Sequence, residues 1–197
     1  MSSVATTTAR SDVRAQPGVV VTGIGVLTAL WCAGFAVFNI AFEFTDHFES
    51  GPYADYAGGF AVMDWFVVAL KIVGAAVALL AVAKRPRFVA PSKLAVVLWG
   101  AFATLALYVA GSLVEAVGML TGLMGSADDI DAAGVAYVCL FLVAATGFGV
   151  LAVSYSRRHQ VRRSRAVLGV LGAPALLGLI LLAVPTLLAA FGLMPAL

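Results

Sequence analysis

The feature that most constrains this chain is a series of five apolar stretches, each long enough to cross a lipid bilayer as a helix. A hydrocarbon core about 30 Å thick needs roughly 20 apolar helical residues. The stretches span about residues 18–42, 59–83, 94–124, 134–155 and 166–193. A transmembrane β-barrel would instead show short segments of alternating polarity, which this sequence lacks. We therefore predict an all-α, polytopic integral membrane protein with five transmembrane helices in a bundle.

The composition agrees with this class. Of the 197 residues, 62% are hydrophobic and only 11% are charged. A soluble domain carries about 25% charged residues, because it needs a water-facing shell. The composition excludes a soluble globular domain, a disordered chain, a disulfide-stapled secreted module and a nucleic-acid binder. The expected surroundings are the lipid bilayer. Other membrane proteins and further copies of the chain stay open as partners, and no nucleic acid is expected.

The charged residues separate into alternate connections between the apolar stretches. Eleven of the twelve cations fall in the N-terminal segment and in the second and fourth connections: Arg10, Arg14, Lys84, Arg85, Arg87, Lys93, Arg157, Arg158, Arg162, Arg163 and Arg165. The first and third connections hold acids instead: Glu43, Asp46, Glu49, Asp55, Asp128, Asp129 and Asp131. Cytoplasmic loops collect Lys and Arg. The pattern predicts a cytoplasmic N-terminus and an extracytoplasmic C-terminus. The arginine-rich fourth connection could also touch anionic headgroups, at about 1 kcal/mol per basic residue near the surface, but the bias explains it equally well and we prefer that explanation.

The domain organisation is simple. Residues 1–17 are small and polar and predict a disordered cytoplasmic tail, and residues 18–197 predict a single five-helix membrane domain. The first apolar stretch exceeds the roughly 7–15 residues of a cleaved signal peptide, so we expect it to be retained. Trp99 and Tyr155 are expected to anchor helices at the inner interface, and Trp31, in mid-span, is expected to pack within the bundle.

The layout of short loops around four or five spans recurs in many small bacterial membrane proteins. Arg outnumbers Lys nine to three amid many Ala, Val, Gly and Leu residues, which is typical of a high-GC genome. We predict a bacterial-type plasma (inner) membrane.

Three ionisable residues, Asp64, Lys71 and Glu115, lie inside the predicted spans, where such residues are energetically expensive and often functional. Counting about 1.5 Å per residue from the cytoplasmic ends puts Asn39, Asp64 and Glu115 about 28–31 Å up, and Glu43 one turn higher. Lys71 comes out near the midplane, at about 18 Å. A helical Cα–Cβ bond tilts toward the helix N-terminus, so Lys71 leans outward and Glu115 leans inward. We expect these side chains to meet.

Each of these residues shares a helix face with small side chains, which let helices approach closely in membranes. The stripes are Cys32 and Ala36 with Asn39 and Glu43; Gly74, Ala75 and Ala78 with Lys71; and Tyr108, Gly111, Ser112, Gly118 and Gly122 with Glu115. We therefore predict that the first three spans face each other around an outward-facing polar pocket. Its candidate residues are Asn39, Glu43, Asp64, Lys71 and Glu115.

Two interpretations of this pocket stay open. In the structural one, Lys71 is a buried counter-ion for Glu115 or Asp64, and the set only fixes the helix register. In the functional one, the pocket binds a proton, a cation or a small polar headgroup, and a carboxyl group changes its protonation state.

Other sites are poorly supported by the sequence. His47 and Glu49 in the first connection form a weak metal candidate, and His159 is expected across the membrane, so no paired-histidine metal or haem site is predicted. No cofactor is expected. Cys32 and Cys139 come out at different depths, too far apart for a disulfide.

The last span contains Pro174 and Pro185, and Gly169 with Ala173 offers a close-packing edge.

The sequence also lacks a nucleophile elbow, a P-loop and a dinucleotide fingerprint. This absence favours a non-enzymatic accessory or interaction subunit of a membrane assembly. The first alternative is a small-molecule, ion or proton-handling membrane protein that uses the outward-facing pocket. The second is a membrane-embedded enzyme acting on lipid or quinone through Asp64, Glu115 or His47.

Overall fold

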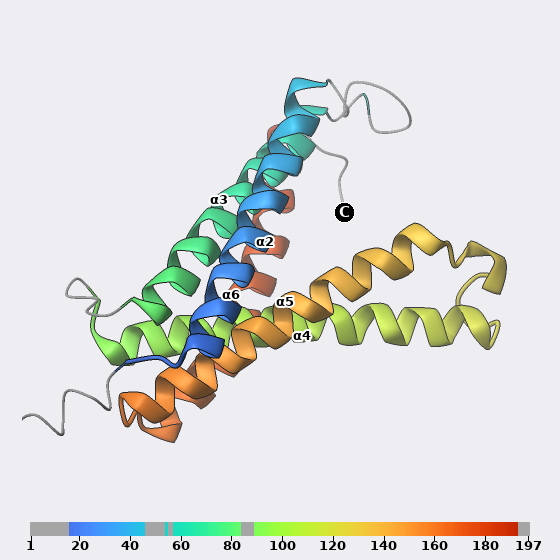
Figure 1. The fold of residues 1–197 in the computed structure, drawn as a ribbon. Helices are drawn as coiled ribbons and strands as arrows, with labels where there is room; N and C mark the ends of the chain where they lie inside the picture. The colour runs from blue at the N-terminus through green and yellow to red at the C-terminus, as the bar shows by residue number, and fades with distance from the viewer. Residues whose placement is uncertain (1–15, 46–53, 55–56, 84–88, 193–197) are drawn as a thin grey trace, which may run out of the picture.

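The computed structural model describes residues 16–45, 54, 57–83 and 89–192, and every long element among them is a helix (Figure 1). Each of the five long helices is long and apolar enough to cross a membrane. The predicted all-α class with five candidate spans is thereby confirmed. The helices are α2 (Val19–Phe44), α3 (Ala57–Val82), α4 (Pro91–Leu120), α5 (Ala132–Arg158) and α6 (Arg163–Ala190).

Helix α4 ends four residues before the predicted boundary at residue 124. Gly122 adopts a φ of 73°, a left-handed conformation that favours glycine. The backbone N–H of Leu123 then donates to the carbonyl of Gly118 at 2.9 Å, and that of Gly122 donates to the carbonyl of Met119 at 3.1 Å. This is the Schellman pattern that terminates helices at a glycine, so the glycine sets the boundary.

The acids of the connection between α4 and α5 cap helices. A short 3-10 helix, η4 (Ala127–Asp129), begins at Ser126, whose hydroxyl accepts a hydrogen bond from the Asp128 N–H at 3.2 Å. The Asp129 carboxylate in turn accepts from the Ser126 N–H at 2.9 Å, which completes a capping box. Asp131 caps α5 by accepting from the Gly134 N–H at 2.6 Å. These acids therefore have a local structural role besides the orientation bias predicted for them.

The helices form two hairpins that meet at one end and diverge toward the other (Figure 1). Helices α2 and α3 form the first hairpin, α4 and α5 form the second, and α6 packs chiefly on α4. We call the shared end the basic end, because the described residues there include Lys93, Arg157, Arg158, Arg162, Arg163 and Arg165. Helix α2 also packs on α5, so α5 makes most of the contact between the second hairpin and the first.

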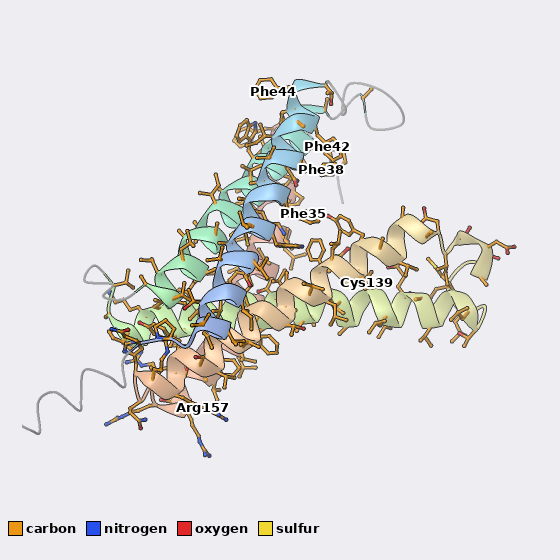
Figure 2. All side chains as sticks on the ribbon, viewed as in Figure 1. Phe35, Phe38, Phe42, Phe44, Cys139 and Arg157 are labelled. Carbon is orange, nitrogen blue, oxygen red and sulfur yellow. The ribbon has the colours of Figure 1, made fainter. Side chains whose placement is uncertain are left out.

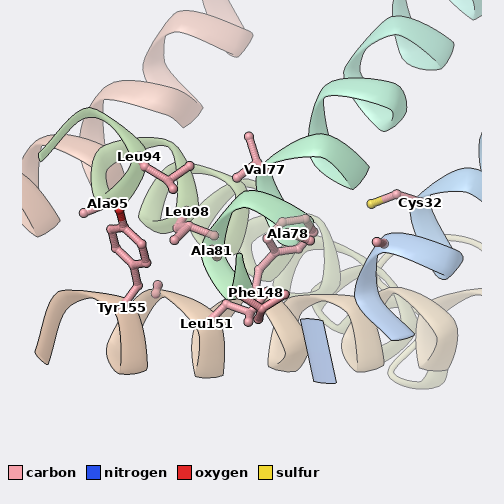
Figure 3. Packing of buried hydrophobic residues seen from close by; sticks show 13 residues of the cluster. Cys32, Val77, Ala78, Ala81, Leu94, Ala95, Leu98, Phe148, Leu151 and Tyr155 are labelled. Carbon is pink, nitrogen blue, oxygen red and sulfur yellow. The ribbon is translucent and has the colours of Figure 1, made fainter. Parts of the chain in front are cut away.

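The hydrophobic core lies toward the basic end, where α2, α3, α4 and α5 meet (Figure 3). Its largest fully buried side chains include Phe148, Leu151, Leu94 and Leu98. Tyr155 also belongs to it, at 1% exposure, with its ring 4.2 Å from that of His159. The prediction that Tyr155 anchors α5 at the interface is therefore wrong, because its ring packs inward on the core.

Close helix contacts depend on glycine at the α4–α6 crossing. A Cβ added at Gly169 would meet the carbonyl oxygen of Val96 and lie 2.7 Å from the Cβ of Trp99. A Cβ added at Gly100 would lie 2.6 Å from that of Ala173. These contacts confirm the close-packing edge predicted for Gly169 and Ala173. Gly169 is nevertheless the only buried residue of α6, which is described throughout, so most of this helix is open to its surroundings.

Candidate functional site

Two of the predicted pocket residues meet in the interface between α2 and α3. The side-chain amide of Asn39 donates to Oδ1 of Asp64 at 2.5 Å. Asp64 is 8% exposed, and its second oxygen, Oδ2, is buried without a hydrogen-bond partner in the described structure. Cys32 and Ala36 are buried on the same face of α2 as Asn39, as their spacing predicted. The α2–α3 interface thus holds a carboxylate that is only partly hydrogen-bonded.

Lys71 lies against aromatic rings. Its ammonium nitrogen is 4.3 Å from the ring centroid of Trp31, 4.5 Å from that of Phe141 and 5.2 Å from that of Phe35. We call these three rings the aromatic cage; Trp31 and Phe35 come from α2 and Phe141 comes from α5. No carboxylate among the described residues forms an ion pair with Lys71. The expected pairing of Lys71 with Asp64 or Glu115 is therefore not found there.

The cage is part of a larger aromatic cluster that joins three helices. The Phe141 ring meets Trp31 edge-on at 5.1 Å and 89° and Phe35 at 5.5 Å and 80°, a favourable geometry for aromatic pairs. Tyr137 on α5 and Tyr108 on α4 extend the cluster, with ring centroids 4.8 Å and 4.6 Å from Phe141. Along α2, Phe35, Phe38 and Phe42 follow one another (Figure 2). The cluster connects the hairpins above the core.

For an α3 that spans a bilayer, the cage would offset the energetic cost of Lys71. Insertion scales put the cost of a lysine at the centre of a transmembrane helix at about 2.5–3.5 kcal/mol. A desolvated cation–π contact contributes about 2 kcal/mol, so two such contacts offset that cost. Lys71 needs no acidic counter-ion under this accounting. The geometry gives Lys71 a packing role against aromatic rings instead of the counter-ion role of the structural interpretation, and it leaves Asp64 as a separate question.

Glu115 lies apart from these residues, on the exposed face of α4. It forms no hydrogen bond or ion pair with the described residues. A Cβ added at Gly111, on the same face, would meet nothing within 4 Å. The expectation that the first three spans enclose the pocket is therefore wrong for the third of them, because the face of α4 that carries Glu115 does not pack on α2 or α3. The α4–α5 hairpin diverges from α2 and α3 away from the basic end (Figure 1). The ring of Phe141 on α5 lies against Lys71 in place of a third wall from α4.

The remaining candidates stay separate from this cluster. One carboxylate oxygen of Glu43 is buried without a hydrogen-bond partner among the described residues. His47 and Glu49, the weak metal candidate, lie outside the described residues. Within residues 16–45, 54, 57–83 and 89–192, no group of three or more His, Cys, Asp or Glu residues is arranged to hold a metal. Cys32 and Cys139 are both free thiols, as predicted from their depths.

The aromatic cage is the part of the site that the sequence does not reveal. Trp31 is expected there only to pack, and nothing distinguishes Phe35 or Phe141 from the other phenylalanines. One signal is present, because Trp31 and Phe35 are four residues apart and so share a helix face beside the small residues Cys32 and Ala36. Nothing in the sequence indicates which distant ring completes the cage.

The chemistry on which function can be argued has three parts. These are the Asn39–Asp64 pair, the ammonium of Lys71 within the aromatic cage, and the exposed carboxylate of Glu115 on α4. Comparison with protein-family models, with curated proteins and with solved structures finds no match to this chain.

Proposed function

We propose that the chain is a multi-pass protein of a bacterial-type plasma membrane that crosses the bilayer five times, with the N-terminus in the cytoplasm and the C-terminus outside. Five apolar helices of sufficient length support the insertion. The arginines of the α5–α6 connection gather at the basic end, whereas Asp128, Asp129 and Asp131 follow the opposite end of α4. This separation supports the orientation, since cationic loops stay on the cytoplasmic side.

We further propose that the protein acts as an accessory or interaction subunit of a membrane assembly. The supporting observation is the exposed face of α4 beyond its contact with α6. In the basic half of α4, Gly100 allows close packing against Ala173 of α6. In the other half, Gly111 and Ser112 present a similar small-residue surface, and Gly111 has no neighbour within 4 Å of its Cβ position. Because small residues in membranes serve helix association, this surface fits a transmembrane helix of another subunit.

The carboxylate of Glu115 limits which side chains the partner helix would present to this surface. The 30-residue α4 is about 45 Å long, more than the roughly 30 Å hydrocarbon core, so it must tilt or protrude. Glu115 lies about 8 Å before the end of α4, near the expected outer boundary of the lipid. A lipid-facing carboxylate costs little at that boundary, where it reaches water. A partner helix packed on this face would displace that water, and a lysine, arginine or amide side chain on the partner would then pair with Glu115.

The test is affinity purification in a mild detergent, comparing Gly111→Leu with Gly34→Leu. Both glycines have open space at the Cβ position, so neither leucine clashes within the protein. We expect a stoichiometric partner with the wild type and with Gly34→Leu. Gly111→Leu should recover it at least about tenfold less, because the added side chain separates the two helix backbones.

Two results would contradict the accessory role. The first is a chain that purifies without a stoichiometric partner from native membranes. The second is a partner retained equally by Gly111→Leu and Gly34→Leu, which would put the contact elsewhere. A photo-crosslinker in place of Glu115 should join α4 to the partner. The same group in place of Leu30, an exposed position on α2, should not.

A second candidate function follows from Asp64. Its buried Oδ2 has no hydrogen-bond partner among the described residues, and a carboxylate in that state supports binding of a proton or a small cation. Asn39 fixes the other oxygen through its amide, so a bound cation would find one carboxylate oxygen held in place. This candidate corresponds to an ion- or proton-handling role and leaves Lys71 outside the binding step.

Cation binding at Asp64 predicts a stability change that depends on this carboxylate. Sodium, potassium and calcium are added separately to the purified protein, and the unfolding midpoint is measured. A cation at 100 times its Kd should stabilise the wild type by about 2.7 kcal/mol. Asp64→Asn should remove the effect, and Glu115→Gln should retain it. If none of the three cations shifts the midpoint of the wild type and the midpoint is also independent of pH, the candidate is rejected.

A further inference from the structure

A groove of about 650 Å³ runs along α5 toward the basic end. Its apolar part is lined by Phe102 of α4 and by Val150 and Val153 of α5. Ser154, Arg157 and Arg158 line the part nearest the basic end. The groove therefore changes along its length from an apolar wall to a cationic one, which is the polarity profile of a lipid molecule.

The two arginines of the groove differ in their contacts. Arg158 donates from its guanidinium to the carbonyl of Ala81 at 2.8 Å and lies 5.6 Å from the ring of Tyr155, so it ties α5 to the end of α3. Arg157 is exposed, and its side chain makes no hydrogen bond or ion pair with the described residues. Figure 2 shows Arg157 at this end of the molecule. Arg157 is thus the arginine available to a ligand.

The length of the groove matches one leaflet of a bilayer. From Thr146, at its apolar end, to Arg157 is eleven residues of helix, or about 16 Å. Half of a hydrocarbon core about 30 Å thick is about 15 Å. An acyl chain that starts at the headgroup level beside Arg157 would therefore end near the bilayer midplane beside Thr146.

We propose that this groove binds an anionic phospholipid of the cytoplasmic leaflet, with the phosphate on Arg157 and one acyl chain along Phe102, Val150 and Val153. The anionic headgroup complements the charge of the basic end, where the described residues include arginines and no acid. The apolar wall offers nothing to a free phosphate, and its length suits an alkyl chain. This site rests on the membrane insertion proposed above and does not depend on the accessory role.

The test uses the purified full chain in a neutral detergent, with lipid added. Native mass spectrometry and the unfolding midpoint are recorded with dioleoylphosphatidylglycerol and with dioleoylphosphatidylcholine. We expect the anionic lipid to bind and to raise the midpoint, and Arg157→Gln to weaken its binding about fivefold, because one basic residue near the surface contributes about 1 kcal/mol. The matched variant Arg165→Gln removes the same charge from an exposed position outside the groove and should keep wild-type binding.

A second variant tests the acyl chain. Val153→Trp should fill the groove and reduce the amount of bound anionic lipid. The protein should still fold, because Val153 is 37% exposed and the helix can accommodate the larger ring. Inorganic phosphate at the same concentration should not raise the midpoint. Equal binding of the two lipids, equal loss in Arg157→Gln and Arg165→Gln, or a full effect of phosphate alone would each overturn the lipid site. Extraction of the chain from membranes by alkaline carbonate would instead overturn the insertion on which it rests.

Discussion

Replacing Phe141 with alanine should lower the free energy of unfolding by about 3–5 kcal/mol, the usual range for a buried aromatic residue. Phe141 is 8% exposed and contacts Trp31, Phe35, Tyr108 and Tyr137. Its removal also takes away one of the rings that surround an ammonium in otherwise apolar surroundings. The loss should therefore exceed that of an ordinary core phenylalanine of the same burial.

A double-mutant cycle with Lys71→Met separates the two contributions. Methionine fills a similar volume, and its thioether packs well against aromatic rings, so Lys71→Met alone should keep most of the stability. In that background Phe141→Ala should be less costly by about 1–2 kcal/mol, which is the expected size of the cation–π coupling. The measurement is reversible unfolding in bicelles or mixed micelles.

Leu151 provides the matched control for this cycle. It is fully buried on the same helix, in the core below the cage. Leu151→Ala should lower the free energy of unfolding by the same amount with and without the Lys71→Met substitution. A coupling between Phe141 and Lys71 below about 0.5 kcal/mol, within the additivity expected of independent sites, would show that the rings do not stabilise the ammonium.

The cycle also bears on the two interpretations of the polar residues. If Lys71→Met preserves both the fold and the binding of a partner subunit, the ammonium is a structural feature enclosed by aromatic rings. Asp64 then becomes a buried carboxylate of the α2–α3 interface that needs a functional explanation, because only one of its oxygens is satisfied by Asn39.

The sequence was informative about depth and helix faces. The count of residues along each span placed Asn39 and Asp64 at similar heights, and the structure joins them by a hydrogen bond. The small-residue spacing of Cys32 and Ala36 correctly indicated the packed face of α2. These predictions succeeded because rise per residue and helical periodicity are local properties.

The sequence could not indicate which helices are neighbours. Glu115 lies at the predicted height along its helix, but its face of α4 is exposed, because α4 packs on α6 and α5 instead of closing over α2. Small residues are compatible with several helix partners, so the stripe that contains Gly111 does not name its partner. The contact of Phe141 with Lys71 is equally nonlocal. Several of the twelve phenylalanines lie within apolar stretches, and only the packing of α5 on α2 selects Phe141.

Gly169→Ala should release much of α6 from α4, because the added methyl group meets backbone instead of a movable side chain. It would collide with the carbonyl oxygen of Val96 and lie 2.7 Å from the Cβ of Trp99, so it can be accommodated only if the helix axes separate. Overpacking of this kind costs about 1–3 kcal/mol. The consequence should be large for α6, since Gly169 is its only buried residue and helix association in a bilayer depends on close packing.

Gly178→Ala in the same helix is the control, because a Cβ at Gly178 meets nothing within 4 Å. It should leave α6 in place and raise helix stability by up to about 1 kcal/mol, the difference in propensity between alanine and glycine. Hydrogen exchange of the α6 backbone and the unfolding midpoint in detergent report the two effects. Faster exchange around Ala173 in Gly169→Ala alone is the expected result. Equal behaviour of the two variants would mean that the α4–α6 crossing does not hold α6 in the bundle, and α6 would then need a partner other than α4 to explain its place in the fold.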